Sequence, residues 1–146
     1  MEHRQLRNYT EEMLADALSF ARPIQTLTLV GCQLSTTTLQ LALTVARTVH
    51  VVRGFFWYKT PFRPDCSPRG RRLTFRGTKG IVEYPVVAAA LIGALVNGGT
   101  VVRIWHPWFT SGPQRQYFER LARWQWIVNV RFIRGNQCMV LVPPVA

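Results

Sequence analysis

The chain has 146 residues, of which 48% are hydrophobic, so it is long and apolar enough to form a folded domain and is not a disordered segment. Its 18 lysines and arginines against seven acidic residues give a net charge of +11. A balance this basic indicates an anionic partner, with nucleic acid ahead of an acidic membrane surface, or a subunit of a larger ribonucleoprotein.

The cysteines and the uncharged stretches exclude several classes of protein. Cys32, Cys66 and Cys138 are odd in number and far apart, which excludes a disulfide scaffold or a zinc ribbon and favours an intracellular, reducing compartment. The stretches 23–46 and 84–102 are too polar or too short for a membrane span, which needs about 20 apolar residues. We also expect no secretory signal, because the N-terminus has no apolar core.

The first part of the chain, residues 1–22, is predicted to hold an acidic helix that covers the sheet or a partner. Asn8 to Glu11 has the spacing of a capping box, and apolar residues follow at helical intervals. Residues 24–59 predict a first βαβ-like unit, in which a strand over 24–30 leads to a helix from Ser35 or Thr36 to about residue 47. A second strand then opens at Val49 and runs to residue 59.

A basic, proline-rich loop is predicted over residues 60–72. Nine basic residues and one acid lie between Arg47 and Lys79, and the aromatic residues 55–58 stand in the same region. Arginine beside exposed aromatic rings suits nucleic acid, because the guanidinium binds phosphate while rings stack on bases. The alternative is that Phe55 and Trp57 belong to the core.

A strand, a glycine-rich loop, a helix and a second strand are predicted over residues 71–107. The first strand alternates around Leu73, and the loop is Gly77-Thr78-Lys79-Gly80. Pro85 fits the first turn of the helix, and residues 97–99 end it before a strand over 100–105. We expect a phosphate to meet the loop N–H groups and Lys79 together.

The last third predicts a helix and a hairpin. Ser111 to Gln114 has capping-box spacing and precedes an amphipathic helix, and strands over 127–134 and 138–142 flank a turn at 135–136. Two sequence echoes, LTxxG at Leu27 and Leu73 and VVR at 51–53 and 101–103, indicate two βαβ-like units. The predicted fold is therefore a single α/β domain over residues 1–146, with its units on one mixed sheet.

From residue 71 to 143 the predicted order is β-α-β-α-β-β, with the glycine-lysine loop before the first helix and a closing hairpin. Residues 77–80, Tyr84 and Val101-Val102-Arg103 are the matching positions. In these features the segment resembles the Alba-like family of small basic proteins that bind DNA and RNA. The resemblance implies that Lys79 contacts nucleic acid.

No pattern for catalysis or metal binding is present. His3, His50 and His106 are scattered, and the sequence has no HxH, HExxH or CxxC spacing. We therefore expect no catalytic or metal site, no cofactor, and a non-catalytic protein that binds RNA somewhat ahead of DNA. The alternatives are a structural subunit that docks on an acidic protein and a degenerate nuclease-like fold; a homodimer or a larger complex is open.

The expected nucleic-acid contacts share a basic side chain in the central loop region or in the later strands. They are Lys59, Arg63, Arg69, Arg71, Arg72, Arg76, Lys79, Arg103, Arg131 and Arg134.

Overall fold

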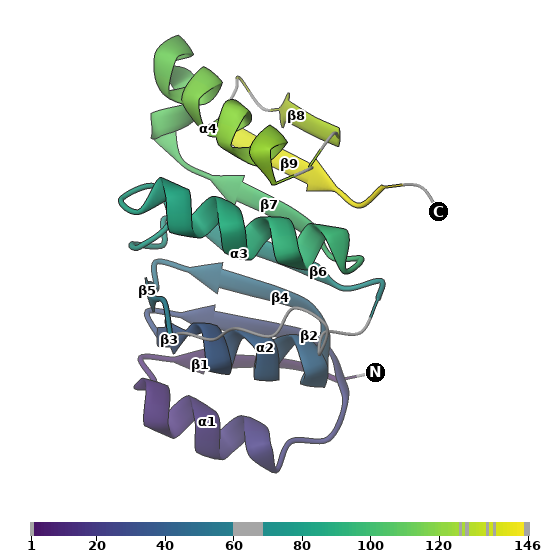
Figure 1. Ribbon diagram of the computed structural model, residues 1–146. Coiled ribbons are helices and arrows are strands. Elements are labelled where there is room, and N and C mark those ends of the chain that lie inside the picture. The colour runs from purple at the N-terminus through teal and green to yellow at the C-terminus, as the bar shows by residue number, and fades with distance from the viewer. Residues whose placement is uncertain are drawn as a thin grey trace.

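A computed structural model describes residues 2–59, 69–125, 127, 129–133, 135 and 137–144. Its main element is one seven-stranded sheet of mixed direction, which confirms the predicted α/β single domain (Figure 1). Five strands are parallel, and a C-terminal antiparallel hairpin completes the sheet. In spatial order the strands are β1 (His3–Arg7), β2 (Ile24–Val30), β4 (Ala46–Val52), β6 (Arg72–Arg76), β7 (Val101–Trp105), β9 (Cys138–Val142) and β8 (Asn129–Ile133).

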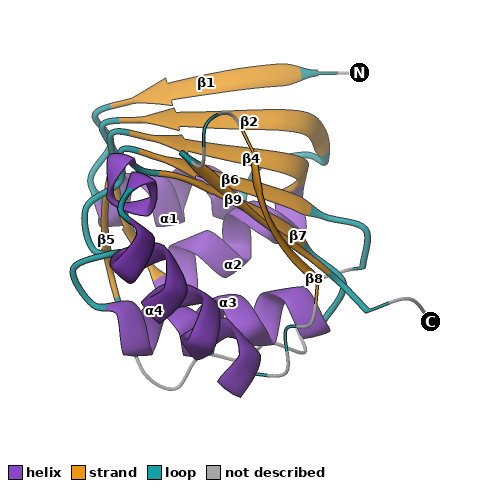
Figure 2. Ribbon diagram, turned by 90° about the horizontal axis from the view of Figure 1, so that it is seen from above, coloured by secondary structure: helices purple, strands orange, loops and turns teal. Residues whose placement is uncertain are grey.

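All the α-helices described lie on one face of this sheet, and no helix among the described residues covers the other face, which we call the open face (Figure 2). A short parallel pair, β3 (Gln33–Ser35) with β5 (Phe55–Trp57), and the 3₁₀ helix η2 (Pro107–Thr110) join strands to helices. The helices are α1 (Glu11–Ser19), α2 (Thr36–Val45), α3 (Pro85–Asn97) and α4 (Gly112–Trp124).

The five parallel strands are neighbours in the order in which the chain forms them, so the backbone advances across the sheet as a coil of strand–turn–helix repeats. Such a one-dimensional stack is an α/β solenoid. The pairing register makes the following positions equivalent, at intervals of 22 to 29 residues: Arg4, Leu27, Val49, Leu73 and Val102. This interval is typical of leucine-rich repeats.

The second repeat shows the pattern most clearly. Ile24, Leu27, Leu29, Cys32 and Leu34 are all buried, and their spacing is L-x-x-L-x-L-x-x-C-x-L, the consensus of leucine-rich repeats. The inward positions of each strand pack against the helices, while the residues between them reach the uncovered face.

Each of the first four parallel strands ends in the same left-handed turn. The residues that follow these strands have positive φ: 59° at Asn8, 65° at Gly31, 49° at Arg53 and 64° at Gly77. The N–H groups of the first three donate to the next parallel strand, with N–O distances of 2.9, 2.9 and 2.8 Å. The shared turn shows that these segments are structural repeats.

The residue after the turn also has a repeated role. Cys32 Sγ donates to the carbonyl of Leu6 at 3.4 Å, and Thr78 Oγ1 donates to that of Val51 at 3.2 Å. Each bond reaches the preceding strand, at positions that the register makes equivalent. Cys32 and Thr78 are both buried, so these bonds satisfy polar groups inside the stack.

Some predicted elements differ from the structure. Residues 1–22 were expected to hold one helix, but β1 precedes α1, and the helix begins after Thr10, whose side chain accepts from the Met13 N–H at 3.2 Å. Asn8 is in the left-handed turn and does not cap the helix. Ser111 stands at the N-cap of α4 without a side-chain capping bond.

The second strand of the first unit was also predicted too long. It splits into β4 and β5, because the left-handed turn at Arg53 interrupts it. Ser35 caps α2 with the predicted capping box, and Pro85 begins α3. The order β-α-β-α-β-β over 71–143 is confirmed.

Candidate functional site

The uncovered face of the sheet carries an ordered array of polar and basic side chains. Because side chains alternate along a strand, every second residue reaches this face. The register places them in rows that cross the sheet. The middle row is Gln5, Thr28, His50, Thr74, Arg103, Val140 and Arg131, and the row beside it is Arg7, Val30, Val52, Arg76, Trp105, Cys138 and Ile133.

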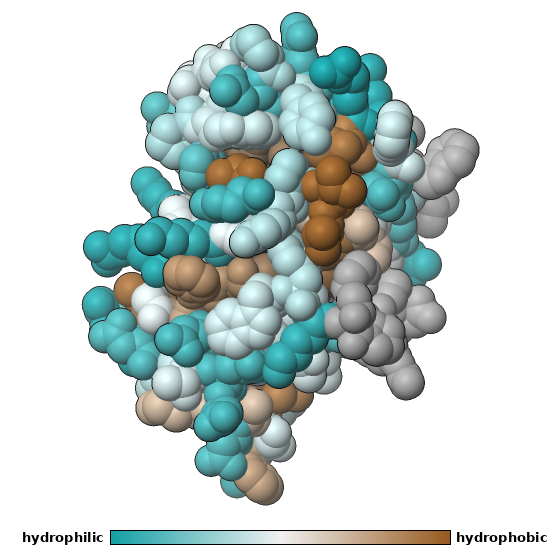
Figure 3. All heavy atoms as spheres, turned by 60° about the vertical axis from the view of Figure 1, so that its left-hand side comes forward, coloured by the Kyte–Doolittle hydropathy of each residue, from teal (hydrophilic) through white to brown (hydrophobic). Residues whose placement is uncertain are grey.

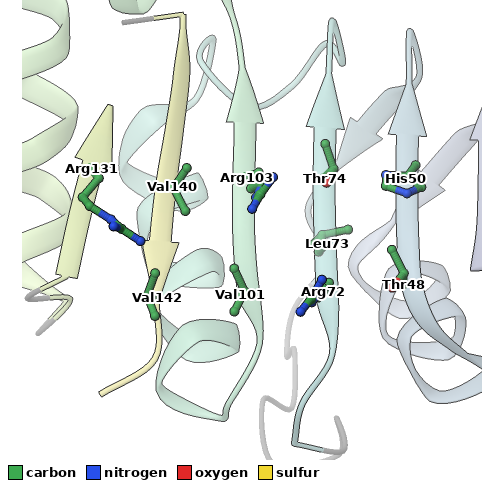
Figure 4. Close-up of a pocket in the computed structure, with 10 residues that line it drawn as sticks. All are labelled: Thr48, His50, Arg72, Leu73, Thr74, Val101, Arg103, Arg131, Val140 and Val142. Carbon is green, nitrogen blue, oxygen red and sulfur yellow. The ribbon is translucent and has the colours of Figure 1, made fainter. Parts of the chain in front are cut away.

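The third row contains Thr48 and Arg72, and with the middle row it forms a shallow hollow of about 430 Å³. Arg72, Arg103 and Arg131 line this hollow from three different strands, as Figure 4 shows. His50, with Thr48 and Thr74, forms its other side. Three guanidinium groups and two threonine hydroxyls therefore line one part of the face, which suits an anion.

The electrostatics of the open face are one-sided. The seven strands of the main sheet contain no aspartate or glutamate, and five of their arginines lie in the three rows of this face: Arg7, Arg72, Arg76, Arg103 and Arg131. The two ion pairs among the described residues, Lys59–Glu11 and Arg123–Glu119, lie in the helix layer and its loops. Arg72 and Arg103 are on adjacent strands and are offset by two residues along them, so their Cα atoms are roughly 8 Å apart. Like charges at this spacing repel, and an anion between them would be stabilised.

An arginine–aromatic pair adjoins the hollow. Arg76 and Trp105 are direct neighbours across β6 and β7, and the guanidinium carbon of Arg76 lies 5.2 Å from the centroid of the indole ring. This cation–π contact holds the guanidinium against the sheet. Both residues belong to the open face.

Other predicted contacts have partners away from this face. Lys59 Nζ lies 2.7 Å from Glu11 Oε1, so its charge is paired. Arg71 Nε donates to the carbonyl of Leu43 at 2.9 Å, at the C-terminal end of α2, where a cation is favourable. Arg69 lies in the turn before β6 and its side chain packs on Gly99.

The glycine-rich loop does not have the expected free N–H groups. The Lys79 N–H donates to Gly54 at 3.0 Å, and the Gly80 N–H donates to the Glu83 carboxylate at 2.9 Å. A carboxylate therefore occupies the place where a phosphate was expected. Lys79 Nζ is 6.0 Å from the centroid of the Phe55 ring. Arg63 and Arg134 lie outside the described residues.

Burial sets the ionisation of several groups. Burial lowers the pKa of His50, so this histidine is neutral near pH 7 in the free protein. Burial alone would raise the pKa of Glu11, but hydrogen bonds from Lys59 and Ser35 outweigh it and lower that pKa. The pKa of the Tyr58 hydroxyl is raised by burial and by the charge of Glu83, and this hydroxyl donates to the Gly80 carbonyl at 2.9 Å.

Thus the structure brings Arg72, Arg76, Arg103 and Arg131 together and separates them from Lys59, Arg69, Arg71 and Lys79. His50 and Trp105 were missed as members of this surface. The available signal was the two-residue alternation, since His50 lies between the buried Val49 and Val51.

Three further findings concern partners. Among the described residues, no group of three or more His, Cys, Asp or Glu side chains could hold a metal ion. No helix in that part of the chain is long and apolar enough to cross a membrane. Comparisons with models of protein families, with curated proteins and with solved structures gave no match to this chain.

Proposed function

We propose that the chain binds nucleic acid without catalysing a reaction, and that the open face of the sheet is the binding surface. The observation that carries the proposal is the cluster of Arg72, Arg103 and Arg131 on strands without a single acid. A protein that needed these charges only for its own fold would place carboxylates beside them. Phosphates supply the missing negative charge, and arginine binds them with two parallel hydrogen bonds.

The position of the surface also supports the proposal. Solenoids present an extended sheet face on which a long ligand can contact several repeats at once. A nucleic-acid strand is such a ligand, because its charges recur along its length. RNA remains somewhat ahead of DNA. The resemblance to the Alba-like family points to the same class of ligand but places the contact on Lys79.

A second candidate is an interaction subunit that docks on an acidic protein. The repeat architecture favours it, since solenoid faces also serve as protein-binding surfaces. The Arg76–Trp105 pair favours nucleic acid, because aromatic and guanidinium planes can stack on bases and a polyglutamate chain offers no such partner.

Fluorescence anisotropy with labelled RNA and DNA oligonucleotides over a salt series tests the proposal. Heparin and polyglutamate serve as competitors that carry charge but no bases. We expect nucleic acid to bind with an affinity that falls steeply with salt. Absence of binding at low salt would refute the proposal, and tighter binding of polyglutamate than of RNA would favour the second candidate. Cleavage of the RNA in magnesium or manganese would refute the non-catalytic part.

A further inference from the structure

The geometry of the open face points to a single strand as the ligand, with one base stacked on the guanidinium of Arg76. We infer that this face takes single-stranded nucleic acid and excludes the duplex from its stacking position. This inference rests on the proposed function and specifies its ligand.

The breadth of the face excludes insertion into a duplex. The major groove of B-DNA, about 12 Å wide, admits one helix or a two-stranded ribbon, and the major groove of A-form RNA is narrower still. Seven strands at about 4.8 Å spacing span roughly 30 Å between the outer two. The arginines lie near the middle of that width, on β6 and β7. A duplex could therefore offer them only its outer phosphates.

The Arg76–Trp105 pair provides a position on the open face where an unpaired base could stack. The guanidinium carbon of Arg76 lies over the indole of Trp105, 5.2 Å from the ring centroid. If the guanidinium lies flat on the ring, its outer plane remains available, and a base could complete a three-layer stack. In a duplex the bases are already stacked on one another and cannot reach this position. Lysine could replace the charge of Arg76 but not its plane.

The neighbouring hollow could bind the phosphates of the same nucleic-acid strand. In the register Arg76 lies four residues along β6 from Arg72, and Thr74 lies between them beside Arg103. A backbone that crosses the sheet at this point would meet guanidinium groups on one side of the stacked base. Thr74 and His50 add donors and acceptors that can bind a sugar hydroxyl or a base edge. On the side of the molecule seen in Figure 3, apolar side chains form separate patches among hydrophilic ones.

Four probes of equal length test this inference: a single-stranded RNA, the same sequence as single-stranded DNA, an RNA duplex, and an abasic oligonucleotide that keeps the phosphates. We expect the two single strands with bases to bind about 5- to 150-fold more tightly than the abasic probe, the range for one stacked base. Equal affinities of the abasic and base-containing strands, or tighter binding of the duplex, would overturn the inference. The proposed function would survive that result. It would fail only if no probe bound with salt-dependent affinity.

Two variants then locate the stack. Arg76→Lys keeps the charge but not the guanidinium plane, so the ratio of its affinities for base-containing and abasic strands should fall toward 1. Trp105→Leu should have the same effect, and Trp124→Leu is its control, since Trp124 is 80% exposed on α4. If Arg76→Lys retains the full preference, the stack does not exist. Because Arg76→Lys removes no buried group, its melting temperature should match that of the wild type and exclude misfolding as the cause.

Discussion

Neutralising the arginines of the hollow tests the binding surface most directly. The change is Arg72→Gln, Arg103→Gln and Arg131→Gln in one protein. Each phosphate contact with a single strand contributes about 0.7 to the slope of log affinity against log salt, so losing three contacts should flatten the slope by about 2 units. If the affinities of the two proteins converge near 1 M salt, that difference is roughly 50-fold at 0.15 M.

The same change should leave the fold intact. Two unit charges about 8 Å apart in water repel by about 0.5 kcal/mol, and salt at 0.15 M screens much of this. Removing the three charges therefore relieves a small repulsion and breaks none of the ion pairs described. We expect a melting temperature equal to or slightly above that of the wild type.

A variant with the same net charge separates the surface from the overall charge. Arg22, Arg120 and Arg123 are exposed and lie outside the strands of the sheet, so replacing them with glutamine also removes three positive charges. The Arg123–Glu119 pair that this breaks is exposed and contributes little to stability. Anisotropy titrations at four salt concentrations should show a slope change below 1 unit. Equal slope changes in both proteins would show that binding follows net charge, and our assignment of the face would be wrong.

Three other predictions concern the repeat turns and a histidine. Arg53→Gly should stabilise the protein and Gly77→Ala destabilise it, each by about 1 kcal/mol in urea unfolding, because both positions are left-handed; stabilisation by Gly77→Ala would contradict this. Thr78→Val should lower the free energy of unfolding by about 1–2 kcal/mol, because it removes the hydrogen bond to the Val51 carbonyl. Thr78→Ser keeps the hydroxyl and should therefore keep most of that stability. Burial lowers the pKa of His50 below its usual 6.5. As the pH falls through this range, His50 takes up a proton in the unfolded chain before it does so in the folded protein. Neutral His50 therefore contributes stability above pH 6.5, and this contribution is lost below it. His50→Gln should therefore reduce the fall in melting temperature between pH 7.5 and 5.5, and an unchanged fall would refute the assignment.

The sequence predicted most helices and strands because their patterns are local. Pro85, Ser35 and the glycines that end α3 are sufficient signals for helix boundaries. The strand β1 was missed, because Leu6 is its only buried side chain and its other residues are polar. Its inclusion in the sheet depends on pairing with β2, a tertiary interaction that a five-residue pattern does not reveal.

Only one of the two sequence echoes marks structurally equivalent positions, because different residue types fill the same place in different repeats. The LTxxG echo is in register, since Leu27 and Leu73 occupy equivalent positions two repeats apart. The VVR echo is not, because Val102 is equivalent to Val49 and not to Val52. Unlike residues share the structural roles: an asparagine, an arginine and two glycines adopt the left-handed turn, while Cys32 and Thr78 make the equivalent bond between strands.

The candidate site was predicted in part, for a related reason. Alternation in β6 already separates Arg72 and Arg76 from the buried Leu73 and Phe75. What the sequence did not reveal is which face remains open. Had helices covered both faces, as in a doubly wound sheet, His50 and Thr74 would be core residues. The placement of all the described helices on one face makes these positions accessible, and it follows from the solenoid order of the strands.

The register of the strands therefore determines the proposed binding face as well as the core. A shift of β6 by one residue would turn Arg72 and Arg76 inward and expose Leu73 and Phe75, which are at most 1% exposed in the structure. Two features oppose such a shift: the left-handed turn after each strand, and the buried bond from Thr78 to the preceding strand. Residues of the proposed binding face and core residues alternate along β6, so one set cannot change register without the other. A strand fixed by its core in this way holds the backbone of its arginines in register before any ligand binds, so less backbone freedom is lost on binding.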